Sequence, residues 1–357
     1  MPIADFYFLE PNRVWRNYLG GAALDRMAGA EEPQDGRFPE DWMLSLTRAV
    51  NPGREDTGEG LSKLRDADGN IVPLTEVSEH FSAGLYGEKH LARYGAHPAF
   101  LLKYLDSAIR LLLQSHPTAE FAREHLNANA GKTEGYYILE TRDPENAYIY
   151  LGFQHPMERE TFKKAVEEQN SAVMLGNFEK IPVRPGDAFL VPGGMPHAIG
   201  EGILMVEIME PSDFVVRLEY IVNGKPLPEP MRYIGGNSDF GMDMVDFNVY
   251  TVDDIRKKFF IRPEEKAAEG SARRFSLFDE RYTDCFRVDL LDVNGSCRCS
   301  LDNSLAVAVI VEGEGAFFAG NTAAAVKKYD RMLIPASRNG FSFEGKGKIL
   351  VIRPPLP

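Results

Sequence analysis

The stretch GDAFLVPGGMPH, residues 186–197, does most to decide the fold. Gly186 provides the turn into an apolar run, AFLV, which is typical of a buried β-strand. Pro192 ends that run, because proline has no backbone N–H to give to a sheet ladder. The glycine pair that follows, Gly193 and Gly194, lets the backbone reverse. We therefore expect a strand and a tight return that carries His197 back to the interior of a β-structure.

Short β-like runs of the same kind surround this stretch and are separated by turn residues. They are GKTEGYYILETRD (131–143), AYIYLGF (147–153), ILMVEIM (203–209) and FVVRLEY (214–220). A helix is expected over 156–170, where a proline opens a charged segment. The spacing predicts an all-β-dominated fold, a sandwich or barrel of antiparallel strands with accessory helices.

The character of the sequence changes twice toward the C-terminus. Residues 226–282 are rich in glycine, proline and charge, and we interpret them as a connecting or inserted segment. β-like runs return over 283–357, where VEGEGAFFAG…YDRMLIPAS resembles IPVRPGDAFLVPGG in outline but carries no histidine. We therefore predict a metal-binding domain over 1–225, including an N-terminal extension and helices, and a second, smaller β-domain over 283–357 without a metal of its own.

Composition excludes several classes of partner. The 357 residues carry a formal net charge of −13, so neither nucleic acid nor an anionic membrane is an expected partner. No apolar run reaches the roughly 18 residues of a membrane-spanning helix, and the first residues lack the pattern of a signal peptide. Three cysteines, an odd number, favour free thiols in a reducing compartment. A cytoplasmic location is expected.

Two pairs of polar residues interrupt the apolar runs at a spacing of two. Gln114 and His116 form one pair, and Lys132 and Glu134 form the other. Residues two apart on a strand point to the same side, so antiparallel pairing of these two strands would bring all four side chains to the mouth of a barrel. With His197 they offer nitrogen and oxygen ligands, the combination that catalytic zinc sites use.

The 186–197 stretch resembles the second cupin metal motif, G-x5-P-x-G-x2-H, at every fixed position. Longer stretches, in the same order, resemble the type I mannose-6-phosphate isomerases, which are zinc-containing cupins. They are LLKYLDSAIRLLLQSHPTAEFA (101–122), GKTEGYYIL (131–139), PVRPGDAFLVPGGMPHAIG (182–200) and GILMVEIMEPSDFVVRLEY (202–220). The resemblance implies a cupin fold, a double-stranded β-helix or jelly roll, with the C-terminal β-domain as a degenerate second copy.

The resemblance also implies a site. The family's zinc ligands fall on Gln114, His116, Glu134 and His197, which gives one zinc ion per chain. The family's active-site lysine falls on Lys132 and its arginine on Arg217. Fixed positive charge of this kind is what a phosphate dianion or a developing enediolate requires. The implied substrate is a small sugar phosphate.

The implied reaction interconverts mannose 6-phosphate and fructose 6-phosphate through a cis-enediol. The residues leave the catalytic base open among Lys132, Glu207, Glu210 and Asp213. Three alternatives are an isomerase of another or a non-phosphorylated sugar, a cupin that binds sugars without catalysis, and a metal-dependent oxygenase. Gln114 speaks against the oxygenase, because iron sites of that kind normally combine histidines with one carboxylate.

Overall fold

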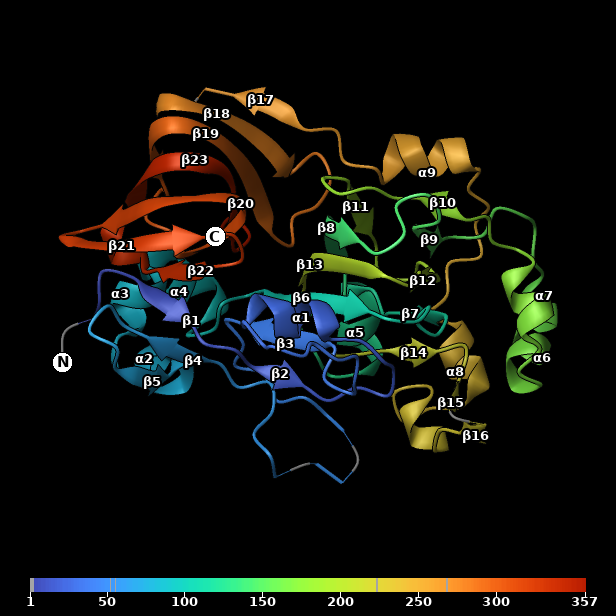
Figure 1. Cartoon of the computed structure of the whole chain (residues 1–357). Coiled ribbons are helices and arrows are strands. Elements are labelled where there is room, and N and C mark those ends of the chain that lie inside the picture. The colour runs from blue at the N-terminus through green and yellow to red at the C-terminus, as the bar shows by residue number, and fades with distance from the viewer. Residues whose placement is uncertain (1–2, 52, 55, 223, 268) are drawn as a thin grey trace. The chain divides into compact units, whose positions relative to one another are not determined.

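The computed structural model describes residues 3–51, 53–54, 56–222, 224–267 and 269–357. The chain divides into two compact units (Figure 1). Unit 1 comprises Met1–Arg13, Asp41–Leu102 and Arg262–Pro357, and unit 2 comprises Val14–Glu40 and Lys103–Ile261. The sequence-based division at 225 and 282 followed chain order, whereas the units interleave, so most of residues 1–102 belong with the C-terminal strands. The described residues include no helix with the length and apolar character needed to cross a bilayer.

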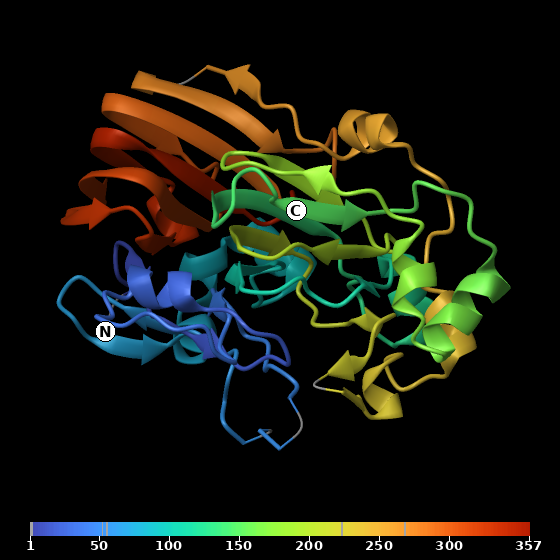
Figure 2. The ribbon, with the colours of Figure 1, turned by 45° about the vertical axis from the view of Figure 1, so that its right-hand side comes forward.

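Unit 1 is built around a large antiparallel sheet. Its strands run in the order β17-β18-β19-β23-β20-β22-β1-β4-β5, with β21 on β20. Their bounds are β1 (Tyr7–Leu9), β4 (Lys63–Arg65), β5 (Ile71–Pro73), β17 (Glu264–Lys266), β18 (Glu269–Phe278), β19 (Arg287–Ser300), β20 (Ala306–Ala319), β21 (Thr322–Lys327), β22 (Arg331–Ile334) and β23 (Gly340–Arg353). Figure 2 shows the long, bent strands β18, β19 and β23 side by side.

The remaining elements of unit 1 are short helices. The helices are α2 (Leu74–His80), α3 (Ser82–Tyr86), α4 (Glu88–Tyr94) and η2 (Ala336–Arg338). One apolar core takes alternate residues of β20 and β23, and the residues between them in the first half of β20 and the last residues of β23 are buried as well, so both faces of the sheet are covered there. Phe6, Phe317, Phe341 and Phe343 are part of this core.

Unit 2 contains two facing antiparallel sheets. One has the order β10-β9-β12-β7-β14, and the other contains β11-β8-β13-β6. The bounds are β6 (Leu101–Ser107), β7 (Gln114–Ser115), β8 (Glu134–Thr141), β9 (Tyr148–Leu151), β10 (Ile181–Pro182), β11 (Ala188–Val191), β12 (His197–Ile199), β13 (Ile203–Met209) and β14 (Val216–Arg217). A shared apolar core joins them, with Ile149 and Ile199 from one sheet and Tyr136, Phe189 and Met205 from the other.

Short helices and hairpins complete unit 2. Within β2 (Arg13–Val14), β3 (Glu40–Met43) and β6 the chain passes from one unit to the other. The helices are α1 (Ala22–Met27), α5 (Ala119–His125), α6 (Arg159–Glu167), α7 (Ser171–Leu175), η1 (Glu229–Met231), α8 (Ser238–Met242) and α9 (Val252–Lys258), and β15 (Ile221–Val222) pairs with β16 (Lys225–Pro226). The helix expected over 156–170 is thus present as α6. The β-dominated fold class is confirmed.

Candidate metal centre

Three neighbouring strands place three polar side chains on one face of a sheet. In the ladder of β12, β7 and β14, Gln114 lies directly opposite His197 on one side and Arg217 on the other. Directly opposite residues of an antiparallel pair project to the same face. The register alone therefore brings these side chains together, although Gln114 and His197 are 83 residues apart in the sequence.

The turn predicted from the glycine pair holds His116 in place. Gly194 has φ +89° and its N–H donates to the carbonyl of His116 (2.7 Å). A Cβ on Gly193 would lie 2.8 Å from the carbonyl oxygen of Pro117, so only glycine fits there without a shift of the backbone. The Ser115 hydroxyl donates to the carbonyl of Gly194 (2.9 Å). These contacts fix the end of β7 against the return to His197.

Glu134 comes from the opposite sheet, which corrects one expectation. The strand that carries Lys132 and Glu134 was predicted to pair with the strand of Gln114 and His116. Instead β8 pairs with β11 and β13, while β7 pairs with β12 and β14. The side chains still converge, because Glu134 is the first residue of β8 and points into the space between the two sheets.

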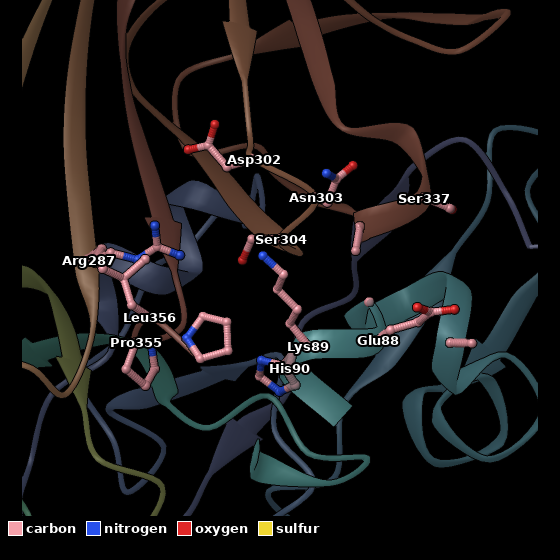
Figure 3. A pocket seen from close by; sticks show the side chains of 14 residues that line it. Glu88, Lys89, His90, Arg287, Asp302, Asn303, Ser304, Ser337, Pro355 and Leu356 are labelled. Atoms are coloured by element: carbon pink, nitrogen blue, oxygen red, sulfur yellow. The ribbon is translucent and has the colours of Figure 1, made fainter. Parts of the chain in front are cut away.

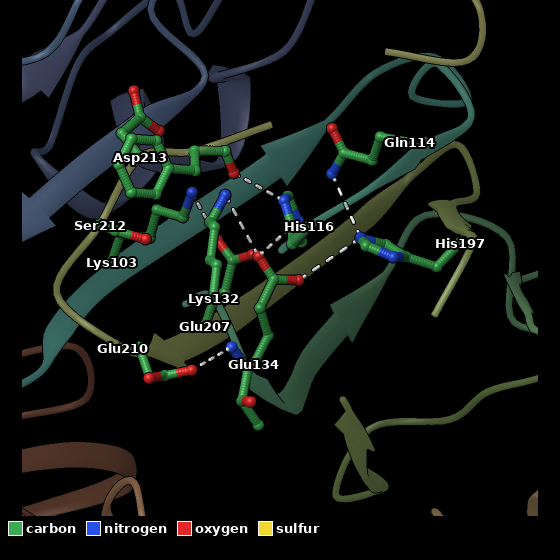
Figure 4. Close-up of polar contacts among 12 residues, drawn as sticks. Lys103, Gln114, His116, Lys132, Glu134, His197, Glu207, Glu210, Ser212 and Asp213 are labelled. Atoms are coloured by element: carbon green, nitrogen blue, oxygen red, sulfur yellow. Dashed lines mark hydrogen bonds and ion pairs between the residues drawn. The ribbon is translucent and has the colours of Figure 1, made fainter. Parts of the chain in front are cut away.

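Both histidines present lone pairs to this carboxylate (Figure 4). The Nδ1 atoms of His116 and His197 lie 2.8 Å from the carbonyl oxygens of Phe214 and Met195. A carbonyl can only accept, so Nδ1 carries the proton in each ring. Burial lowers the pKa of His116 to about 3 and also lowers that of His197, so both rings are neutral and both Nε2 atoms are unprotonated.

The three groups need a cation between them. His116 Nε2 lies 3.1 Å from Glu134 Oε1, and His197 Nε2 lies 3.5 Å from Glu134 Oε2. These are contacts between acceptors, and all three side chains are essentially inaccessible to water. Within the described part of the chain, His116 Nε2 and Glu134 Oε1 have no hydrogen-bond partner. Such orphaned buried acceptors are costly unless a metal ion satisfies them.

The distances fit a small divalent ion. Zinc bonds of about 2.0–2.1 Å place the ligands of a tetrahedral site about 3.3–3.4 Å apart. The two His–Glu distances span this value, and Gln114 Nε2 lies 3.3 Å from His197 Nε2. A half-turn of the Gln114 amide would put its oxygen at that position. His116, Glu134 and His197 offer ligand atoms that all lie within 4.8 Å of one another, so these residues fit a metal.

Two buried lysines next to the cluster supply positive charge. Lys132 Nζ lies 3.3 Å from Glu134 Oε1. Lys103, from β6, lies 2.6 Å from Glu207 on β13, and Figure 4 shows its ammonium group beside that of Lys132. Burial lowers the pKa of Lys103, and the neighbouring charge of Lys132 adds to the effect. Two lysines this close are favourable only where negative charge is also gathered.

An ion-pair network continues from Lys103 to the edge of the site. Glu40 lies 3.5 Å from Lys103 and 2.9 Å from Arg16, and Arg16 lies 3.2 Å from Asp213. The hydroxyl of Tyr18 donates to Glu40 (2.6 Å). Asp213 and Glu207, two of the base candidates, are therefore each paired with a cation.

Glu210, a third base candidate, braces the loop that carries Lys132. Its two carboxylate oxygens accept from the backbone N–H groups of Gly131 (3.1 Å) and Thr133 (2.8 Å). Arg217 is half-buried, and its guanidinium donates to the carbonyl of Met231 (2.5 Å). Burial lowers the pKa of Arg217 to about 10. The carboxylate of Glu210 thus accepts two hydrogen bonds, and the guanidinium of Arg217 places a positive charge beside Gln114.

Sequence reasoning missed Arg16, Tyr18, Glu40 and the pairing role of Lys103. A signal existed for Lys103, because it stands within LLKYLDS, a strand that is buried along its entire length. A lysine in such a strand needs a buried partner. No comparable local signal marks Arg16 or Glu40, whose role depends on contacts with residues far along the chain.

Facing antiparallel sheets with a His/Glu/His cluster between them define the chain as a cupin. Residues 278–354 match the family model of the mannose-6-phosphate isomerase cupin domain. The chain is 28% identical over 349 residues to mannose-6-phosphate isomerase ManA of Bacillus subtilis (strain 168), covering 96% of this chain and 97% of the relative. Over nearly its whole length the chain is thus similar in sequence to mannose-6-phosphate isomerases.

Solved structures show the same fold. The crystal structure of the mannose 6-phosphate isomerase from Bacillus subtilis superposes with a TM-score of 0.75 at 22% identity, covering 97% of this chain and 99% of that one. A mannose 6-phosphate isomerase bound with zinc and yttrium superposes with a TM-score of 0.71 at 17% identity, covering 99% of this chain and all of that one. The cupin fold predicted from the sequence is therefore confirmed.

Proposed function

We propose that this chain interconverts mannose 6-phosphate and fructose 6-phosphate at one zinc ion held by Gln114, His116, Glu134 and His197. The observation that carries the proposal is the convergence of two neutral imidazoles on a buried carboxylate, with Lys132 3.3 Å from that carboxylate. The family supplies the class of enzyme, a sugar-phosphate isomerase, and the named relatives supply the sugar. The zinc-bound structure of similar fold supports the choice of metal.

The reaction moves one proton between two carbons. A base removes the proton from carbon 2 of the aldose, a cis-enediol forms, and a proton is returned to carbon 1 to give the ketose. Zinc, when bound, would polarise the oxygens at carbons 1 and 2 as a Lewis acid. Atoms and charge balance, because the proton lost at one carbon is replaced at the other and the hydroxyl protons exchange between the oxygens.

The contacts favour Lys132 as the group that carries this proton. Glu207 is paired with Lys103, Glu210 accepts from two backbone N–H groups, and Asp213 is paired with Arg16. Carboxylates whose oxygens are already engaged in this way are poorly placed to take the proton from carbon 2. Lys132 Nζ lies at the edge of the metal cluster, 3.3 Å from Glu134 Oε1, and in its neutral form this amine would accept the proton from carbon 2.

The other cations have supporting roles. Lys103 and Arg217 place positive charge on two sides of the cluster, where it would stabilise an enediolate or the phosphate dianion. Arg217 presents a planar guanidinium, which matches phosphate oxygens better than an ammonium group does. Glu40 and Glu207 keep Lys103 charged and in position.

A proton NMR time course tests the proposal. Purified, zinc-loaded protein is incubated with mannose 6-phosphate, and a parallel sample holds free mannose. We expect fructose 6-phosphate only from the phosphorylated sugar, no product with His197→Ala, and full activity with the control His155→Ala, whose side chain is 56% exposed. Conversion of free mannose alone would move the substrate to a non-phosphorylated sugar. No conversion in either sample, with metal bound, would contradict the proposal.

A further inference from the structure

Unit 1 contains a cavity that shares no residue with the metal centre (Figure 3). Its volume is about 390 Å³, within the range of small-molecule sites. The walls come from α4, from the loop that includes Asn303 and Ser304, from η2 and from the last residues of the chain, including Pro355 and Leu356. These segments all belong to unit 1, so the cavity is complete within that unit.

One wall carries a cation without a carboxylate partner. Arg287 Nε donates to the carbonyl of Pro354 (2.9 Å), and no carboxylate of the described residues lies within ion-pair distance of its guanidinium. In the β19–β23 ladder it lies directly opposite Arg353, which is paired with Asp289. Burial and the charge of Arg353 lower the pKa of Arg287 to about 10. A half-buried guanidinium beside another arginine is a site that an anion would stabilise.

A second cation lies across the cavity from Arg287. Figure 3 shows the side chain of Lys89 reaching toward Ser304. The two acids of the lining, Glu88 and Asp302, are exposed at the rim. Asp302 is 74% exposed, and its carboxylate lies 3.6 Å from Arg353. The lining therefore carries two carboxylate side chains and two cationic ones, and Arg287 is the less exposed of the two cations.

The walls are tied together before any ligand binds. The hydroxyl of Tyr94 donates to the carbonyl of Leu356 (2.8 Å), and the N–H of Asn303 donates to Asn339 Oδ1 (2.7 Å). Gly87 lies so close to this loop that a Cβ would be 2.8 Å from the carbonyl oxygen of Asn303. A preformed cavity costs a ligand little ordering free energy.

We propose that this cavity is a second binding site, for a small organic anion whose phosphate or carboxylate group lies between Arg287 and Lys89. An apolar ligand would leave the half-buried guanidinium of Arg287 without an ionic partner, which is costly. The proposal is independent of the isomerase activity.

Isothermal titration calorimetry with glycerol 3-phosphate tests this site, because that probe is a small organic anion with a phosphate group. We expect the dissociation constant to rise about tenfold or more in Arg287→Gln, equivalent to about 1.4 kcal/mol, and several-fold in Lys89→Ala. The control Arg273→Gln removes a charge from the same sheet, at a side chain that is 62% exposed and paired with Asp292. It should bind as the wild type does, and uncharged glycerol should give no heat.

Three results would overturn the proposal. They are no binding heat in the wild type up to about 10 mM probe, equal binding in the wild type and both cavity variants, and an equal loss in Arg273→Gln. Binding of the probe at the metal centre would have the same dissociation constant in all these variants. It therefore cannot produce a rise that is confined to the two cavity variants. Lys89 is exposed, so Lys89→Ala decides the test if Arg287→Gln fails to fold.

Discussion

Removal of the metal should lower the free energy of unfolding of unit 2 by a measurable amount, because the metal ligands are buried. His116, Glu134 and His197 are each at most 1% exposed, and without a cation their acceptor atoms face one another at 3.1 and 3.5 Å. Unfolding exposes these groups to water, whereas a metal ion binds the folded arrangement. The free energy of metal binding therefore appears as stability of the folded state.

The magnitude follows from mass action. At a free zinc concentration one hundred times the dissociation constant, the stabilisation is about 2.7 kcal/mol. Each kcal/mol moves the melting temperature of a domain of about 150–250 residues by about 2–4 °C. Unit 2 falls in that size range, so zinc should raise its melting temperature by about 5–10 °C over that of the chelated protein.

The assay is thermal unfolding followed by circular dichroism, in zinc-buffered solution and with excess chelator. His197→Ala should lose the zinc-dependent rise, because it removes one of the converging lone pairs. His155→Ala should keep the rise, since this histidine is 56% exposed and lies outside the cluster. A melting temperature that zinc leaves unchanged in the wild type, or a full rise in His197→Ala, would refute the reasoning.

Four further predictions follow from the same contacts. Lys132→Met should lower kcat by about 10²-fold or more while KM changes little, because the amine transfers the proton and does not contribute to substrate binding. Steady-state kinetics with mannose 6-phosphate measure both constants, and a change in KM alone would contradict the prediction. Arg217→Lys should lower kcat/KM by about tenfold, since an ammonium group lacks the planar donor pair; unchanged kcat/KM would place the phosphate elsewhere. Glu210→Gln should cost about 1–3 kcal/mol of unfolding free energy, because one of the N–H groups of Gly131 and Thr133 loses its acceptor; urea titration of this variant beside the wild type measures it, and an equal midpoint would contradict it. In the chelated protein, stability should fall as pH drops below 6.5, because the unfolded chain takes up a proton at His116 that the folded chain, with a pKa of about 3, does not. The slope should be about 0.7 kcal/mol per pH unit at pH 6.5 and approach about 1.4 below pH 5.5 for each such histidine, and an equal pH dependence in His116→Gln would contradict it.

The local parts of the site could be predicted from the sequence. Gly193 and Gly194 determine a turn through backbone geometry alone, and spacing by two places Gln114 and His116 on one side. These features depend on neighbours in the chain, so the sequence contains them directly. The same holds for β13, whose bounds Ile203–Met209 coincide with the predicted run.

Features that depend on long-range pairing could not be predicted. The sequences of two short strands that carry metal ligands look the same whether the strands are hydrogen-bonded neighbours or face each other across a core. The partner of β8 was therefore predicted wrongly. Pairing of β1 with β22, through Tyr7 and Leu333, joins the two ends of the chain. No local pattern in the N-terminal residues indicates β22 as the partner of β1. Because of this pairing, N-terminal and C-terminal residues belong to the same unit.

The metal centre itself is tested most directly by X-ray diffraction from crystals of the zinc-loaded protein, with data measured above and below the zinc absorption edge. The account predicts one strong anomalous peak per chain within bonding distance of His116 Nε2, His197 Nε2, a carboxylate oxygen of Glu134 and the amide oxygen of Gln114, at about 2.0–2.2 Å from each. A peak bound elsewhere, or no peak between the two sheets in crystals grown with excess zinc, would contradict it.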